Sequence, residues 1–150
     1  MRLESPAFEN GGAIPSKYTC DGADVSVPLR FLEVPEAAKS LALIVDDPDA
    51  PMGIFVHWVV YDIPASLEGL PEGVPPAPML EGGIKQGVNS FGKIGYGGPC
   101  PPNGTHRYYF KLYALDTLLN LEPGLGKHEL LAAMRGHVID GAELMGLYAR

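Results

Sequence analysis

The stretch GYGGPCPPNGTHRYYFKLYALD, residues 95–116, joins two segments of opposite physical character. Its first half is glycine and proline, which neither a helix nor the middle of a sheet accommodates. Its second half is rich in aromatic and aliphatic residues and predicts a strand over His106–Ala114. At the junction, His106, Arg107 and Tyr108 place a titratable ring, a fixed cation and a phenol in consecutive positions. A rigid loop that leads polar groups onto a buried strand is a common way to build a binding site.

The composition of the whole chain predicts one globular domain over residues 1–150. A length of 150 residues with 46% hydrophobic and 19% charged residues suits a single core. Nineteen glycines and fifteen prolines favour short strands joined by turns over a helical bundle. The net charge of -7 argues against a nucleic-acid partner, which would need a basic face. No apolar run reaches the ~18 residues of a membrane span.

The N-terminal sequence and the two cysteines give information on the cellular compartment of the protein. Residues 1–6 contain no signal-peptide hydrophobic region, so we expect a cytoplasmic protein, although a removed presequence would leave no trace. Cys20 and Cys100 are too few for a disulfide scaffold and have no CxxC spacing. Two free thiols are the favoured interpretation. A single bridge remains open, because each cysteine lies in a turn-rich loop.

Short strands joined by turns predict a mainly β domain of two packed sheets. Besides His106–Ala114, the expected strands cover residues 2–8, Val27–Phe31, Ser40–Asp46, Phe55–Ile63 and Ile84–Val88. The apolar spacing of Lys127–Arg135 predicts a helix, and the glycines of residues 137–148 favour a strand. Residues 64–81, rich in proline and glycine, predict an ordered surface loop.

Two further polar clusters sit beside proline-stiffened turns. Asp47 and Asp49 belong to the turn DPDAP, whose two prolines fix the backbone. His57 lies in the expected strand that follows, where alternation places it on the face opposite Trp58. A lone histidine in an apolar strand is more often a core residue than a functional one. The second histidine, His106, leaves a core role and a functional role about equally open.

These segments carry a resemblance to a known family. DPDAP at residues 47–51, followed by HWVV at 57–60 and IP at 63–64, resembles the first signature of the phosphatidylethanolamine-binding protein (PEBP) family. The glycine–proline loop that starts at Gly98, followed by HRY at 106–108, is similar to the second signature. The likeness extends over nearly the whole chain in the same order. YTCDG at residues 18–22 and YGGPC at 96–100 resemble the short bacterial and archaeal branch that contains the YbhB/YbcL-like proteins.

The resemblance implies an antiparallel β-sandwich with one or two short peripheral helices and a small anion pocket at one end. Carried over position by position, the ligand-binding residues are Asp47, Pro51, His57, Gly98, Pro99, His106 and Tyr108. Trp58 and Arg107 have supporting roles, and we expect Arg107 to pair with Asp49. The resemblance implies no catalytic residue, metal or cofactor.

The residue types agree with an anion pocket and add a constraint. Backbone N–H groups of the loop, an imidazole N–H and the Tyr108 hydroxyl can all donate to a phosphate oxygen. An ionised Asp47 would repel an anion, so it must pair with a histidine or be protonated when the ligand is bound. We therefore expect anion affinity to rise as the pH falls toward ~6, near the ordinary pKa of histidine.

Three classes of function follow. The leading one is a binding protein for a small phosphorylated or carboxylated ligand, such as a phospholipid head group or a nucleotide-like molecule. This binding protein would be a monomer or homodimer and could regulate a partner protein. The alternative is a serine protease or kinase inhibitor that acts through surface loops such as residues 64–81.

The third class of function is a hydrolase or zinc site built from Asp47, His57 and His106. Against it, the sequence contains no HExxH, GxSxG or paired-cysteine spacing, and Cys100 as a nucleophile lacks an identifiable orienting partner beyond His106. We therefore expect no enzymatic activity.

Overall fold

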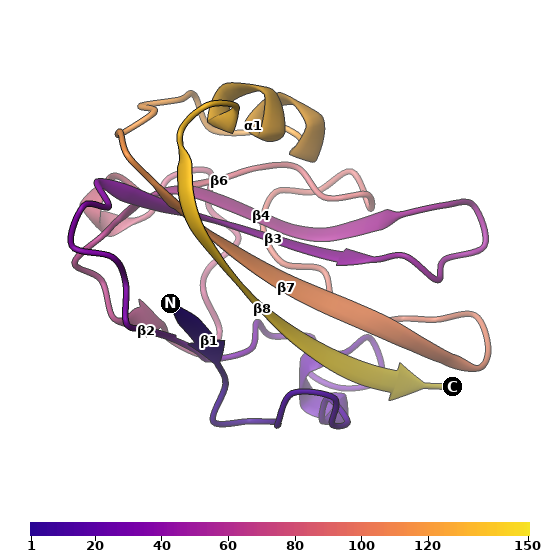
Figure 1. Ribbon diagram of the computed structural model, residues 1–150. Coiled ribbons are helices and arrows are strands. Elements are labelled where there is room, and N and C mark those ends of the chain that lie inside the picture. The colour runs from indigo at the N-terminus through magenta and orange to yellow at the C-terminus, as the bar shows by residue number, and fades with distance from the viewer.

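The computed structural model describes residues 1–150 as two antiparallel sheets packed against each other (Figure 1). The large sheet has the order β6 (Lys85–Gln86), β4 (Phe55–Pro64), β3 (Ser40–Asp47), β7 (Thr105–Leu115) and β8 (Val138–Ala149). The small sheet has the order β1 (Arg2–Glu4), β2 (Leu29–Leu32) and β5 (Gly69–Leu70). The expected β-sandwich is confirmed.

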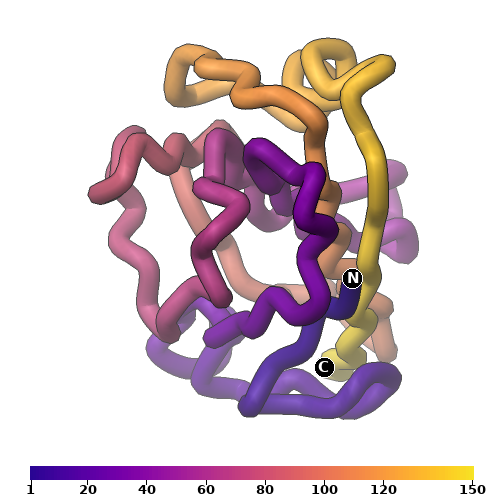
Figure 2. The backbone as a smooth tube through the Cα atoms, turned by 60° about the vertical axis from the view of Figure 1, so that its left-hand side comes forward, coloured from indigo at the N-terminus to yellow at the C-terminus, as the bar shows by residue number.

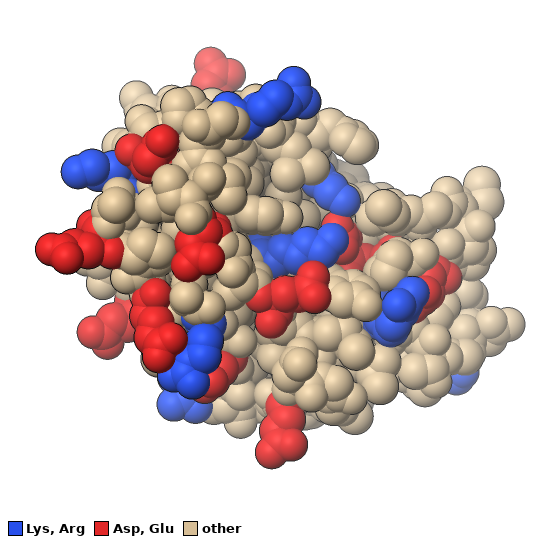
Figure 3. Space-filling model, in the orientation of Figure 1, with Lys and Arg blue, Asp and Glu red and all other residues tan.

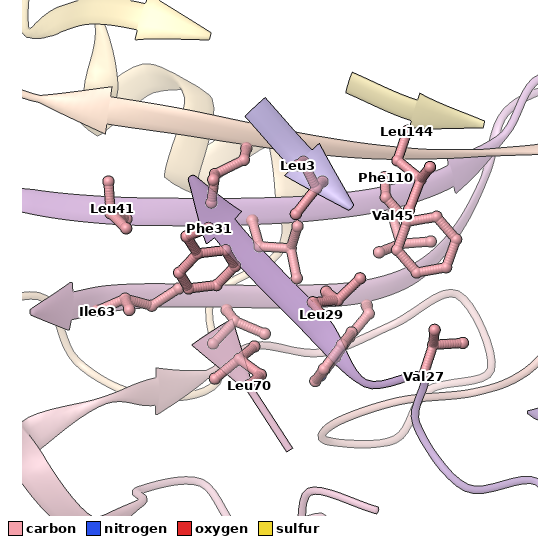
Figure 4. Packing of buried hydrophobic residues seen from close by; sticks show 14 of the residues in the cluster. Leu3, Val27, Leu29, Phe31, Leu41, Val45, Ile63, Leu70, Phe110 and Leu144 are labelled. Atoms are coloured by element: carbon pink, nitrogen blue, oxygen red, sulfur yellow. The ribbon is translucent and has the colours of Figure 1, made fainter. Parts of the chain in front are cut away.

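Strand β3 lies at the centre of the large sheet and is buried along its whole length. Both of its faces are covered, which explains why its sequence is almost continuously apolar. Leu41 and Val45 face the small sheet, where Figure 4 shows them in the same cluster as Leu3, Phe31 and Leu70. The core of the sandwich therefore forms between the two sheets.

The opposite face of the large sheet is covered by the one α-helix, α1 (Lys127–Met134), and by the segment that precedes it. In Figure 2 both lie at the top of the molecule, away from the N-terminal segment at the bottom. Leu130 and Met134 pack in a second apolar cluster with Ile44 of β3. The remaining helical pieces are the 3-10 turns η1 (Ser16–Tyr18) and η2 (Glu81–Gly83). None of these helices has the length and apolar character that crossing a membrane requires.

The segment 64–81 differs from the expected surface loop, because it contains the edge strand β5. Gly69 and Leu70 pair with β2, and Leu70 is buried. Further along, the carbonyl and hydroxyl oxygens of Ser26 accept the backbone N–H groups of Gly73 and Val74. A two-residue strand has no periodicity of its own, so its sequence could not distinguish it from a loop.

The two cysteines form a disulfide, so the favoured interpretation as free thiols is wrong. Cys20 and Cys100 are 80 residues apart in the chain, and their Cα atoms lie 5.4 Å apart. The Cys20 N–H donates to the carbonyl of Pro99, which brings the two loops side by side. The bonded sulfur of Cys100 cannot act as a nucleophile. Because disulfides occur in oxidising compartments and also inside hyperthermophiles, the cytoplasmic location stays a prediction.

Candidate functional site

A cavity of about 330 Å³ lies at the end of the sandwich where the β3–β4 turn approaches the loop before β7, on the right of Figure 1. Its lining residues are Asp47, Ala50, Pro51, Met52, Gly53, Ile54, Phe55, His57, Phe91, Cys100, Pro101, Pro102, His106 and Tyr108. Five of the seven predicted ligand-binding residues are among them, and Gly98 and Pro99 are not. A larger cavity of about 440 Å³ lies beside β1 and β8, but its polar lining consists mainly of surface side chains such as Glu4, Glu9 and Asn10.

Strand β7 delivers His106 and Tyr108 to the cavity and turns Arg107 away from it, as the alternation predicts. The Nε and Nη2 atoms of Arg107 bind both carboxylate oxygens of Asp49, at 2.9 and 2.7 Å. The Arg107 backbone N–H donates to the same carboxylate at 2.9 Å. This guanidinium lowers the pKa of Asp49 to about 2. The expected pair of Arg107 and Asp49 is therefore present and ties the β3–β4 turn to β7.

The prediction that His57 and Trp58 lie on opposite faces of β4 is wrong. Val45 pairs with Trp58 and Asp46 pairs with Val56, so His57 is an extra residue in a β-bulge. The bulge turns His57 toward Tyr108, with ring centroids 5.2 Å apart, on the same face as Trp58. Trp58 itself is fully buried in the core, as expected.

The carboxylate of Asp47 is held by the protein on both oxygens. One oxygen lies 2.6 Å from Nδ1 of His106, and the other accepts the backbone N–H of Asp49 at 2.7 Å. Both Asp47 and His106 are buried. The carboxylate therefore pairs with a histidine, one of the two arrangements that would reconcile it with an anion in the same cavity.

The two histidines are oriented in the same manner. Nδ1 of His57 lies 2.6 Å from the carbonyl oxygen of Gly97. A carbonyl and a carboxylate only accept, so each ring carries its hydrogen on Nδ1 and leaves Nε2 without a protein partner. Burial lowers the pKa of His57, which makes its neutral form more stable than in water.

The ring of Tyr108 lies beside both histidines, and its hydroxyl is the one buried side-chain polar atom that has no hydrogen-bond partner in the protein. Tyr108 is only 1% exposed, and burial raises the pKa of its phenol far above neutrality. Unpartnered buried polar atoms are rare, so this hydroxyl requires an explanation. The phenol stays neutral, and Tyr108 is one of the residues that line the cavity.

The loop of Gly97 and Gly98 does not offer these backbone N–H groups to a ligand, which corrects the expectation. Gly97 donates to the carbonyl of His57 at 2.9 Å, and Gly98 donates to Oδ1 of Asp24 at 2.8 Å. A Cβ atom at Gly98 would lie 2.3 Å from this Asp24 oxygen, so only glycine fits. Gly98 and Pro99 therefore support the loop and do not line the cavity. Asp24 was not predicted as part of the site, because it lies 74 residues from its partner Gly98.

Comparison with known proteins assigns this architecture to a family. The family model of the phosphatidylethanolamine-binding protein matches residues 4–149. The chain belongs to the PEBP family. It is 56% identical to a UPF0098 protein of Methanothermobacter thermautotrophicus, over all of this chain and 99% of that protein. The resemblance seen in the sequence is confirmed, and membership of this family indicates a ligand-binding protein.

Two crystal structures resemble the present PEBP fold closely. CT736, a PEBP homologue of Chlamydia trachomatis, is 47% identical, with a TM-score of 0.92 over 99% of this chain and 97% of its own. YbcL of Escherichia coli, described as a member of the mammalian PEBP family, is 32% identical, with a TM-score of 0.91 over 99% of this chain and 98% of its own. The fold is therefore that of the PEBP family.

Two aromatic residues of this PEBP cavity were missed at the level of sequence. The rings of Phe55 and Phe91 meet edge to face at a centroid distance of 4.7 Å, and Phe91 lies 5.6 Å from His57. The sequence signal that could have revealed Phe91 is its position as an aromatic residue inside the polar turn that leads into the glycine–proline loop. No three His, Cys, Asp or Glu side chains of the chain are grouped so that they could hold a metal ion.

Proposed function

We propose that residues 1–150 form one domain that binds a small anion, with the acid group of the ligand over His57, His106 and Tyr108. The single observation behind the proposal is that His57, His106 and Tyr108 line one cavity with the Tyr108 hydroxyl and both Nε2 atoms left without a protein partner. An acid group with several oxygens can partner all three atoms at once. Phosphate, a phospholipid head group, a nucleotide-like molecule or a carboxylate meets this requirement.

Proton uptake accompanies anion binding in this proposal. A neutral histidine offers a lone pair at Nε2, and a protonated one offers an N–H there. The anion therefore favours protonation of His57, while the Tyr108 phenol stays protonated at every physiological pH. His106 lies against the Asp47 carboxylate, so protonation of His57 supplies the positive charge that favours an anion at the floor of the cavity.

A binding role fits these residues better than catalysis. The Asp47 oxygens are both engaged, and the Tyr108 phenol stays protonated, so neither is a ready nucleophile. None of residues 64–81 lines the cavity, so a protease- or kinase-inhibiting role would act separately from the anion site.

The test is a titration of the protein with inorganic phosphate, followed by NMR of the histidine rings. We expect the ring signals of His57 and His106 to shift together and saturate. Those of His137, an exposed histidine outside the cavity, should remain in place. An unchanged spectrum at millimolar phosphate at pH 6, or equal shifts at all histidines, would contradict the proposal.

A further inference from the structure

The cavity has a polar floor and an apolar mouth. His57, His106 and Tyr108 at the floor are buried. At the mouth, Met52 is 99% exposed and Ile54 is 60% exposed, and both line the same cavity as the partly exposed Phe91. In Figure 3 the corresponding right-hand end of the molecule is almost free of charged side chains, which gather over the rest of this face. A ligand that enters this cavity passes an apolar surface before it reaches the polar one.

Phe91 is a fixed wall of this mouth rather than a mobile surface residue. The Asn89 side chain accepts the N–H groups of Phe91 and Lys93, at 2.9 and 3.2 Å, and donates to the Gly95 carbonyl. The ring lies so close to Gly97 that a Cβ atom there would be 2.5 Å from two of its carbons. Despite this support, Phe91 remains 45% exposed. The fold therefore holds an aromatic face open to the cavity.

No free carboxylate at the mouth is available for a positively charged ligand tail. Asp47 is the one acidic residue of the lining, and its oxygens are held by His106 and by the Asp49 backbone. Asp49 lies nearby and is paired with Arg107 on both oxygens. An ammonium group on the ligand would therefore be desolvated against apolar side chains without an ion-pair partner.

The volume also exceeds what an acid group needs. At about 330 Å³ the cavity falls at the lower end of the range of about 300–1,000 Å³ that holds whole small molecules. A phosphate group over His57 and His106 fills only the floor. The remaining space lies between Phe55, Phe91 and the 50–54 turn.

We infer that the ligand is an anion that carries an apolar group, aromatic or branched aliphatic, close to its acid group. The acid group lies on the polar floor, and the apolar group packs against Phe55, Phe91 and Met52. The inference rests on the proposed function and adds a selectivity to it. The protein prefers an apolar substituent over the aminoethyl group of phosphorylethanolamine.

The test compares three probes by calorimetry at pH 6: inorganic phosphate, phosphorylethanolamine and phenyl phosphate. Burial of a phenyl ring at the mouth should make phenyl phosphate bind about tenfold more tightly than phosphorylethanolamine. If phosphate binds and phenyl phosphate is no tighter than phosphorylethanolamine, the inference is overturned and the proposed function stands. If none of the three probes binds, both fail.

Matched variants separate the mouth from general surface effects. Met52→Ser and Phe91→Ser should each reduce the preference for phenyl phosphate several-fold. Met79→Ser should leave it unchanged, because Met79 is also an exposed methionine, at 57%, and does not line the cavity. Equal effects of Met52→Ser and Met79→Ser would overturn the inference. Self-association that Met52→Ser abolishes, without any preference for phenyl phosphate, would instead assign the mouth to a second copy of this chain.

Discussion

The Nδ1 atom of His106 lies 2.6 Å from an oxygen of Asp47, and this buried pair joins the end of β3 to the start of β7. The second Asp47 oxygen accepts the Asp49 N–H, so the same carboxylate also fixes the proline-stiffened turn. One side chain thus sets both the tautomer of a cavity histidine and the shape of the cavity wall.

Asp47→Asn should weaken sulfate binding at pH 6 by about tenfold, because a charge-assisted hydrogen bond that orients His106 is lost. An asparagine has one acceptor oxygen for two donors, the His106 ring and the Asp49 backbone. Its NH2 group must face one of these donors. Isothermal titration calorimetry of the variant and the parent protein measures the change.

The control is Asp116→Asn, which removes the carboxylate of a similar pair outside the cavity. Asp116 lies 2.8 Å from Nδ1 of His137, and both side chains are exposed. Sulfate affinity should not change in this variant. An equal loss in both variants would mean that the orientation of His106 is not what controls binding.

The second prediction concerns pH. Burial lowers the pKa of His57, while the nearby carboxylates of Asp47 and Asp24 oppose this shift more weakly. Anion binding favours the protonated ring, so affinity should rise as the pH falls and continue to rise below the ordinary histidine pKa of about 6.5. Sulfate is the suitable probe because its own charge is constant between pH 5 and 8. A flat sulfate affinity over that range, measured by calorimetry, would refute the prediction.

Regular strand geometry explains what the sequence could predict about the site. In β7 the alternation separates His106 and Tyr108 from Arg107, and no bulge disturbs it before Ala114. The strong strand character of the segment and the two prolines of the 47–51 turn are local properties. These two expectations agree with the structure, whereas the strands expected over residues 2–8 and Ile84–Val88 are shorter, because β1 covers only Arg2–Glu4 and β6 only Lys85–Gln86.

The expectations that failed depend on contacts between distant segments. The bulge at His57 arises from its pairing with β3, and alternation within β4 alone cannot reveal it. The Gly98 N–H donates to Asp24 and is not available to a ligand. Cys20 forms a disulfide with Cys100, which lies 80 residues away in the chain. Each of these features requires the folded arrangement of the loops.

The third prediction tests the disulfide. Reduction, or the double substitution Cys20→Ser with Cys100→Ser, should lower the free energy of unfolding by about 2–4 kcal/mol, because the bond closes a long loop in the unfolded chain. Urea denaturation of the oxidised and reduced protein measures this. Mass spectrometry after alkylation in denaturant should find no labelled cysteine before reduction. Two labelled cysteines would show that the bond is absent.

The fourth prediction separates binding from stability. Tyr108→Phe removes a buried hydroxyl that has no protein partner, so the unliganded protein should gain about 1 kcal/mol of unfolding free energy. Phosphate affinity should fall by about tenfold, because the ligand loses a hydrogen-bond donor. Urea denaturation without ligand and calorimetry with phosphate give the two values.

Tyr61→Phe is the matched control for that experiment, because the Tyr61 hydroxyl is satisfied within the protein. It donates to the carbonyl of Glu122 and accepts the Leu125 N–H at 3.1 Å, on the face of the sheet that α1 covers. Its loss should lower the unfolding free energy by about 1 kcal/mol and leave phosphate affinity unchanged. The two tyrosines should therefore shift stability in opposite directions, and only Tyr108 should change binding. If Tyr108→Phe destabilises the protein as Tyr61→Phe does and binds phosphate normally, the Tyr108 hydroxyl is structural and the anion site must lie elsewhere.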